Sequence, residues 1–220
     1  MAPWEPIIAR HIFAENVVRA ICDAGGVVVG PYVRNYIAYK AEADGAPGCV
    51  WDKYALPDVP ETVDVWACHN VIDDIKAAIE ALQVQFVLIS HENGREIYQL
   101  RSIDVAAAKQ ALWDSLPAFV DRNAIVHNIP LPENSAFKIA FRPFYGEMRP
   151  AGGRVEDIDY ECNSLCIYEG IIQPTFGEMP PYENMKVVRR ITDDIIAGRA
   201  VWIGEGERNR DSETETLFTH

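Results

Sequence analysis

Residues 25–37 (GGVVVGPYVRNYI) constrain the fold more than any other part of the chain. Residues 27–29 are apolar and β-branched, which is typical of a short buried strand. Gly30 follows at once, and because it has no Cβ it permits a sharp turn or a close approach to a ligand. Pro31 has no N–H and a fixed φ, which suits the first turn of a helix. The stretch therefore predicts a strand, a tight turn and a helix start whose unpaired amides favour an anion.

A second β-rich run, residues 62–66 (TVDVW), carries one acid, Asp64, at its centre. A strand that ends at a glycine and leads into a helix, followed by a strand bearing an acid, resembles the polymerase-β-like nucleotidyltransferase superfamily. The pattern is similar to the G-G-x-V-R-D … D-x-D arrangement of poly(A) polymerases and CCA-adding enzymes. The layout also resembles uncharacterised nucleotidyltransferase-fold proteins of large DNA viruses. The resemblance covers residues 5–90, with a looser similarity up to residue 170.

The chain departs from this family at three positions. Pro31 stands where the family has a second glycine, and Asn35 stands where an acid normally follows the arginine. The family's pair of acids falls on Thr62 and Asp64, so its first member is missing. We therefore expect a nucleotidyltransferase-like fold with a degenerate acidic motif, more plausible as an inactive protein than as an active one.

The resemblance implies a set of site residues. Enzymes of this family use two or three carboxylates on neighbouring strands to hold two divalent ions, normally Mg2+. If the chain is active, Asp64 is the catalytic acid, and Asp64 and Asp159 are the candidate metal ligands. The positions implied for binding a nucleoside triphosphate are Gly26, Gly30, Arg34 and Thr62.

Each of these assignments has a purely structural alternative. Arg34 suits a phosphate because of its guanidinium group, but an ion pair with Asp64 or another acid explains it equally well. Asp64 alone on a strand is also consistent with an acid that caps a turn or faces solvent. A third acid is expected on a neighbouring strand, where residues 137–144 offer only Lys138 and Arg142. The acidic run at residues 157–161 is the other possible source.

The periodicity of apolar residues predicts an α+β fold with a mixed sheet flanked by helices, extended by a C-terminal hairpin and helix. Asn-Gly at residues 93–94 is a strong hairpin signal. Helices are expected at residues 6–24, after Gly30, and at 71–82, 103–116 and 185–196. Strands are expected at 27–29, 62–67, 86–90, 96–101, 125–129, 136–144, 163–168 and 171–173. We expect one domain over residues 1–203, with a core at 5–145, an extension at 146–203 and a disordered acidic tail at 204–220.

The formal charge of −13 argues against a general nucleic-acid binder, because phosphates attract basic surfaces. No apolar run is long enough for a membrane span, and the N-terminus lacks the pattern of a signal peptide. We therefore expect a cytoplasmic protein, located in the host cytoplasm or the virion if it is viral.

The cysteines are odd in number and form no C-x-x-C pair, which favours reduced thiols. A zinc site that includes Cys49, Cys68 and His69 is an open alternative. The long loop at residues 41–60 contains Trp51 and Tyr54. These aromatic side chains could stack on a nucleotide base, or they could pack over an edge of the hydrophobic core.

The sequence leaves three functions open. The first is a non-catalytic nucleotidyltransferase-fold module for binding or assembly. The second is a divergent Mg2+-dependent enzyme that modifies a protein or small molecule. The third is an interaction protein without nucleotide binding that works with a protein partner or as a homodimer.

Overall fold

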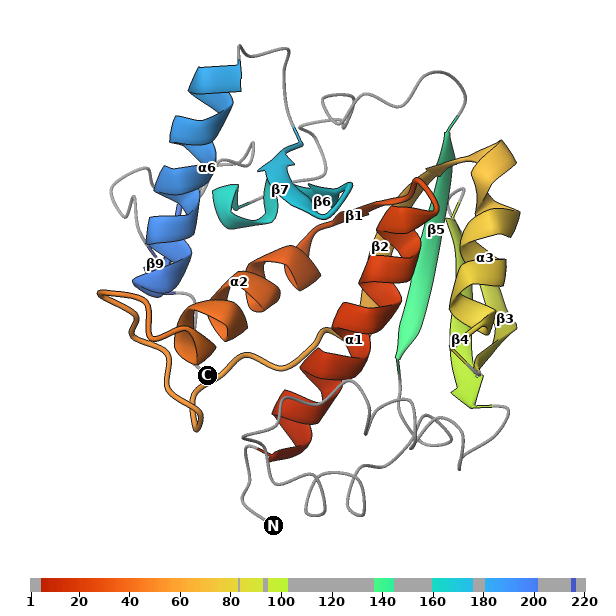
Figure 1. Cartoon of the computed structure of the whole chain (residues 1–220), viewed down its shortest axis with the longest axis horizontal. Coiled ribbons are helices and arrows are strands. Elements are labelled where there is room, and N and C mark those ends of the chain that lie inside the picture. The colour runs from red at the N-terminus through yellow and green to blue at the C-terminus, as the bar shows by residue number, and fades with distance from the viewer. Residues whose placement is uncertain are drawn as a thin grey trace.

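A computed structural model describes residues 5–82, 84–92, 95–102, 137–144, 160–175, 181–201 and 215–216. Within these residues, four α-helices pack on a mixed seven-stranded sheet, which confirms the expected α+β class (Figure 1). The helices are α1 (Glu5–Asp23), α2 (Pro31–Ala43), α3 (Ile72–Glu80) and α6 (Pro181–Ile196). The strands of the sheet are β1 (Val27–Val29), β2 (Thr62–Cys68), β3 (Val84–Glu92), β4 (Arg95–Ser102), β5 (Lys138–Phe144), β6 (Leu165–Tyr168) and β7 (Ile171–Pro174).

Smaller elements complete the described part of the chain. The 3-10 turns η1 (His69–Val71) and η3 (Glu161–Asn163) precede α3 and β6. Strand β8 (Arg199–Ala200) pairs with β9 (Glu215–Thr216), which lies within the expected tail after residue 203. The expected helix at 103–116 and strand at 125–129 lie outside the described residues, as do the remaining tail positions.

The strand order places β2 at the centre of the sheet. The order is β3-β4-β5-β2-β1-β6-β7. Strand β2 pairs in parallel with β5 and antiparallel with β1, while the other neighbouring strands run antiparallel. Both expected hairpins, β3–β4 and β6–β7, are confirmed. In this register Asp64 lies across from Val29 on one side and from Ala140 on the other.

The two faces of the sheet differ, and β2 shows the difference most clearly. Val63, Val65 and Ala67 are fully buried, whereas the alternating residues Thr62, Asp64, Trp66 and Cys68 are half-buried. Successive side chains of a strand point to opposite faces, so the buried set lies under the helices. We call this the helix-covered face, and the side that carries Asp64 the second face.

All four helices contribute to one core on the helix-covered face. Figure 1 shows α1 and α3 in front of the β2–β5 and β3–β4 regions, with α2 and α6 toward the β6–β7 side. The fully buried core residues shared among these elements include Val17, Ile21, Val33, Ile75, Ile139, Phe141, Leu165 and Ile195. A smaller cluster on the second face joins Val27, Val29 and Cys166 with the partly buried Trp66 and Tyr168.

Helix α1 ends in a tight turn that leads directly into β1. Gly25 has φ 88°, which favours glycine, and the N–H of Gly26 donates to the carbonyl of Ile21 at 2.8 Å. The Cβ that a side chain at Gly26 would add lies 2.5 Å from Ile21 Cγ2 and 2.9 Å from Ile75 Cδ1. Gly26 therefore permits close packing of β1 against α1 and α3.

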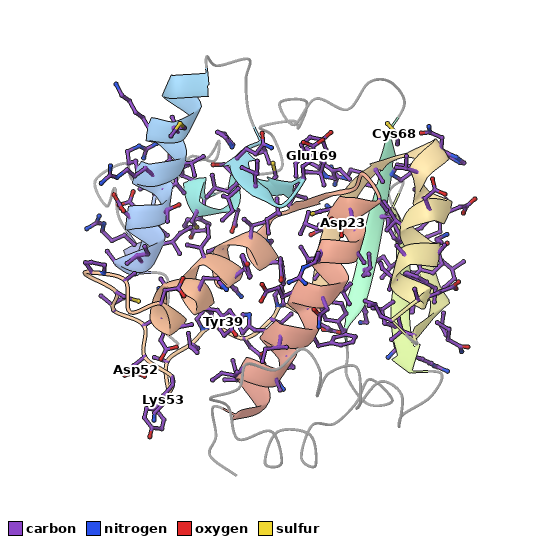
Figure 2. The ribbon with its side chains drawn as sticks, viewed as in Figure 1. Asp23, Tyr39, Asp52, Lys53, Cys68 and Glu169 are labelled. Atoms are coloured by element: carbon purple, nitrogen blue, oxygen red, sulfur yellow. The ribbon has the colours of Figure 1, made fainter. Side chains whose placement is uncertain are left out.

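Two hydrogen bonds connect the loop between α2 and β2 to helices α6 and α2. Trp51 is buried and its Nε1–H donates to the carbonyl of Ile195 at 2.8 Å, so it covers an edge of the core. Tyr54 is 67% exposed, and Figure 2 shows Asp52 and Lys53 at the outer end of the same loop. Near β2, the Asn35 side-chain amide donates to the carbonyl of Asp58 at 2.7 Å.

His11 on α1 holds the same loop from within the core. Its ring is fully buried, is stacked on Tyr39 with centroids 4.5 Å apart, and lies 2.8 Å from the Pro57 carbonyl through Nε2. Because a carbonyl only accepts, Nε2 carries the hydrogen, and the buried Nδ1 has no hydrogen-bond partner among the residues that the structure describes. Burial lowers the pKa of His11 below 6.5, against the raising effects of the Pro57 bond and of Asp58. The neutral ring is therefore the form that fits the fold.

We expect the protein to lose stability as the pH falls below 6.5, and His11 to account for part of that loss. The unfolded chain binds a proton at His11 more readily than the folded chain, so this contribution is complete above 6.5 and declines as the pH drops toward the folded pKa. Urea unfolding at a series of pH values measures the slope of the free energy of unfolding against pH. His11→Gln should flatten the slope, whereas Leu88→Ala, at an exposed position that does not titrate, should leave it unchanged. An equal slope in all three proteins would contradict this assignment.

Candidate functional site

The junction of β1 and α2 has the geometry expected from the sequence. Gly30 is the N-cap of α2, with φ 77° and ψ −150°, and Pro31 occupies the first helical position. This backbone conformation is essentially restricted to glycine. A Cβ at Gly30 would lie 3.7 Å from Asp64 Oδ2, which is ordinary contact, so the backbone conformation rather than space requires glycine here. The helix start and Asp64 are therefore neighbours.

Asp64 lies near the middle of β2, on the second face. Its side chain is 26% exposed, and Oδ1 lies 3.5 Å from Arg95 Nη1. Burial raises the pKa of Asp64, and the positive charges of Arg95 and Arg142 act in the opposite direction. Asp64 is thus a partly desolvated carboxylate next to two guanidinium groups.

Strand β5 provides no acid beside Asp64. The parallel register places Ala140 across from Asp64, Lys138 across from Thr62, and Arg142 across from Trp66. Lys138 forms an ion pair with Glu61, which immediately precedes β2. The position of β5 beside β2 agrees with the expectation that residues 137–144 form the neighbouring core strand. At that position the strand carries positive charge.

The described residues do not fit a two-metal site. Thr62 carries no negative charge, and the neighbouring strand contributes two cations and an alanine around Asp64. Among the described residues, no three His, Cys, Asp or Glu side chains are grouped so that they could bind a metal ion. This finding includes Cys49, Cys68 and His69, so the zinc alternative has no support there. Asp159 lies outside the described residues.

Gly26 and Arg34, two other predicted site residues, have contacts of their own. Gly26 is at the far end of β1 from Gly30, packed between Ile21 and Ile75. Arg34 donates through Nε to Asn35 Oδ1 at 2.8 Å, and its charge acts on the Cys162 thiol. Its charge lowers the pKa of that thiol, although the larger effect of burial raises it.

Arg95 is the site residue that the sequence did not reveal. It begins β4, and the pairing of Glu96 with Phe141 brings it next to the Arg142 position on β5. The signal available was the Asn-Gly hairpin, which fixes the local register of β3 and β4. That signal does not say which strand β4 joins on its other side, so the contact with Asp64 could not be predicted.

Searches of protein-family models, curated proteins and solved structures found no match to this chain. No helix in the described ranges is both long and apolar enough to cross a membrane. The function is therefore inferred from the residues around Asp64.

Proposed function

We propose that this protein is a non-catalytic binding or assembly module built on a nucleotidyltransferase-like sheet. The observation that carries the proposal is the register of β5 against β2, which sets Lys138, Ala140 and Arg142 beside Asp64. On this proposal the chain keeps a nucleotidyltransferase-like scaffold, while positive charges stand where metal-dependent chemistry needs negative ones.

The arrangement of three strands supports the scaffold part of the proposal. Strand β1 leads through Gly30 into α2, and β2 is antiparallel to β1 and parallel to β5. This order brings the turn at Gly30 and the acid Asp64 together. The resemblance implied a site where a helix start meets two central strands. The start of α2 and strands β1 and β2 offer such a place.

Electrostatics supports the non-catalytic part. Two divalent ions bind between neighbouring strands only where several carboxylates offset their charge. Here one carboxylate already interacts with Arg95 and Arg142. A divalent cation placed beside Asp64 would be repelled by both guanidinium groups, since the screening by water is reduced at a partly buried site. The same cations favour an anion.

An assay for nucleotide transfer tests this proposal. The purified full chain is incubated with labelled ATP, GTP, CTP or UTP and with magnesium or manganese, and pyrophosphate release and labelling of the protein are followed. We expect neither to exceed the rate without protein. Metal-dependent pyrophosphate release that disappears in Asp64→Asn would contradict the proposal and favour a divergent enzyme.

A further inference from the structure

We infer that the protein forms a symmetric dimer in which strand β3 pairs antiparallel with β3 of a second copy of the chain. Strand β3 is the edge strand on one side of the seven-stranded sheet. With nine residues it is also the longest strand that the structure describes. Strands β4 and β5 separate it from β2, so this edge is not part of the site at Asp64 and of the function proposed for that site.

The outer edge of β3 lacks the features that normally prevent pairing. An edge strand presents a row of N–H and C=O groups, and proteins protect such a row with charged side chains, with proline or with a short strand. Residues 84–90 (VQFVLIS) contain no charged residue and no proline. Among the described residues, β4 is the strand that pairs with β3, on its inner side. The opposite edge of the sheet, β7, has four residues and ends at Pro174. Of the two edges, β3 is therefore the better suited to accept another strand.

Exposed apolar side chains lie along the same edge. Val84, Phe86 and Leu88 alternate along β3 and point to one face of the sheet. Val84 is fully buried and Phe86 packs against the core, whereas Leu88 is 57% exposed. The next residue, Ile89, is 47% exposed. The apolar side chains of β3 are therefore covered at the start of the strand and open to solvent toward its end.

An irregularity after Leu88 defines the part of β3 that can pair. The ladder with β4 shifts at this point, where Ile89 is an extra residue, and such a bulge bends the strand. The regular part is residues 84–88, centred on Phe86. In an antiparallel pair with a two-fold axis at Phe86, Leu88 of each copy lies across from Val84 of the other. The exposed end of each strand then meets the covered end of its partner, and each Leu88 gains an apolar neighbour.

Charge favours a second copy of the chain as the occupant of this edge. The chain carries a formal charge of −13, so two copies repel each other over most of their surfaces. Residues 84–90 are uncharged, and the repulsion is therefore smallest where these strands meet. The same lack of charge gives the edge no means of selecting a partner of opposite charge. An identical strand, by contrast, places apolar side chains across from apolar side chains.

Sedimentation equilibrium of the full chain over a wide concentration range tests the inference. We expect a monomer–dimer equilibrium in the micromolar range, because pairing of one short strand buries less than about 1,200 Å². Leu88→Lys should weaken the dimer at least about tenfold, since it places a charge in the contact. Ile171→Lys on β7 and Met185→Lys on α6 are matched controls at exposed apolar positions and should leave the dissociation constant unchanged. Figure 1 shows β3 and α6 on opposite sides of the molecule.

Hydrogen exchange measures the pairing of the backbone itself. In the wild type, the amides of residues 84–88 should be better protected at high protein concentration than at low concentration, a result that does not depend on the folding of any variant. A chain that stays monomeric, a dimer that Leu88→Lys leaves intact, or assemblies larger than a dimer would each overturn the inference. Metal-dependent nucleotide transfer would contradict the proposed function without affecting the dimer, so the two proposals can fail separately.

Discussion

Replacement of Phe141 by alanine is expected to lower the free energy of unfolding by about 3–5 kcal/mol. Phe141 is fully buried on β5, under the helices. Its ring packs edge-on against Tyr98 with centroids 5.9 Å apart, and lies 6.2 Å from the ring of Phe86. Lys76 Nζ, which also hydrogen-bonds to the Tyr98 hydroxyl, lies 5.9 Å from the same ring. Truncation removes these contacts and leaves a cavity between β4 and α3.

Urea unfolding of the wild type and of Phe141→Ala measures this loss. Phe141→Leu retains most of the volume and should cost less than about 1.5 kcal/mol. Tyr54→Ala, on the exposed loop, should change the free energy by less than about 0.5 kcal/mol. A loss below about 1 kcal/mol in Phe141→Ala would mean that β5 is not anchored through this residue. The position of Arg142 beside Asp64 would then lose its support.

Replacement of Gly26 by alanine is expected to cost about 1–3 kcal/mol of stability, as overpacking does. The new methyl group would lie 2.5 Å from Ile21 Cγ2 and 3.1 Å from the Ile21 carbonyl oxygen. Ile75 Cδ1, at 2.9 Å, can turn away more easily because it ends a flexible side chain. Ile21 Cγ2 is bonded directly to Cβ, so it can move away only if χ1 changes, and χ1 of a buried β-branched residue is stiff. The strain therefore falls on the packing of α1 against β1.

A double-mutant cycle identifies the clash. Ile21→Ala removes Cγ2, so the added cost of Gly26→Ala should fall in that background. An added cost that stays the same in the Ile21→Ala background would contradict the assignment of the clash to Ile21 Cγ2.

Local patterns in the sequence predicted the local structure well. The β-branched run before Gly30, the proline after it and the Asn-Gly pair before Arg95 each specify a conformation over a few residues, and strand, helix start and hairpin follow. The alternation along residues 136–144 places Phe137, Ile139 and Phe141 inward and Lys138, Ala140 and Arg142 outward, and the structure agrees except at Ala140, which is buried. Such signals act within one element, where side-chain period and backbone preference decide the outcome.

The site depends on contacts between distant elements, which these patterns do not encode. Arg95 meets Asp64 only because β4 joins β5, and β5 joins β2. Gly26 and Gly30 look alike in the sequence, yet one glycine is required by the side chains of Ile21 and Ile75 and the other by its own backbone conformation. Asp159 remains a prediction, since it lies outside the described residues.

A thermal-shift titration tests most directly whether arginine charges replace metal-binding acids around Asp64. The wild type and Asp64→Asn are titrated with each of the four nucleoside triphosphates, with and without magnesium or manganese. A ligand present at about a hundred times its dissociation constant stabilises a protein by about 2.7 kcal/mol, which is readily measured. We predict that metal adds nothing to any stabilisation by nucleotide, and that Asp64→Asn does not reduce it. Stabilisation that requires the metal and disappears in Asp64→Asn would contradict the claim.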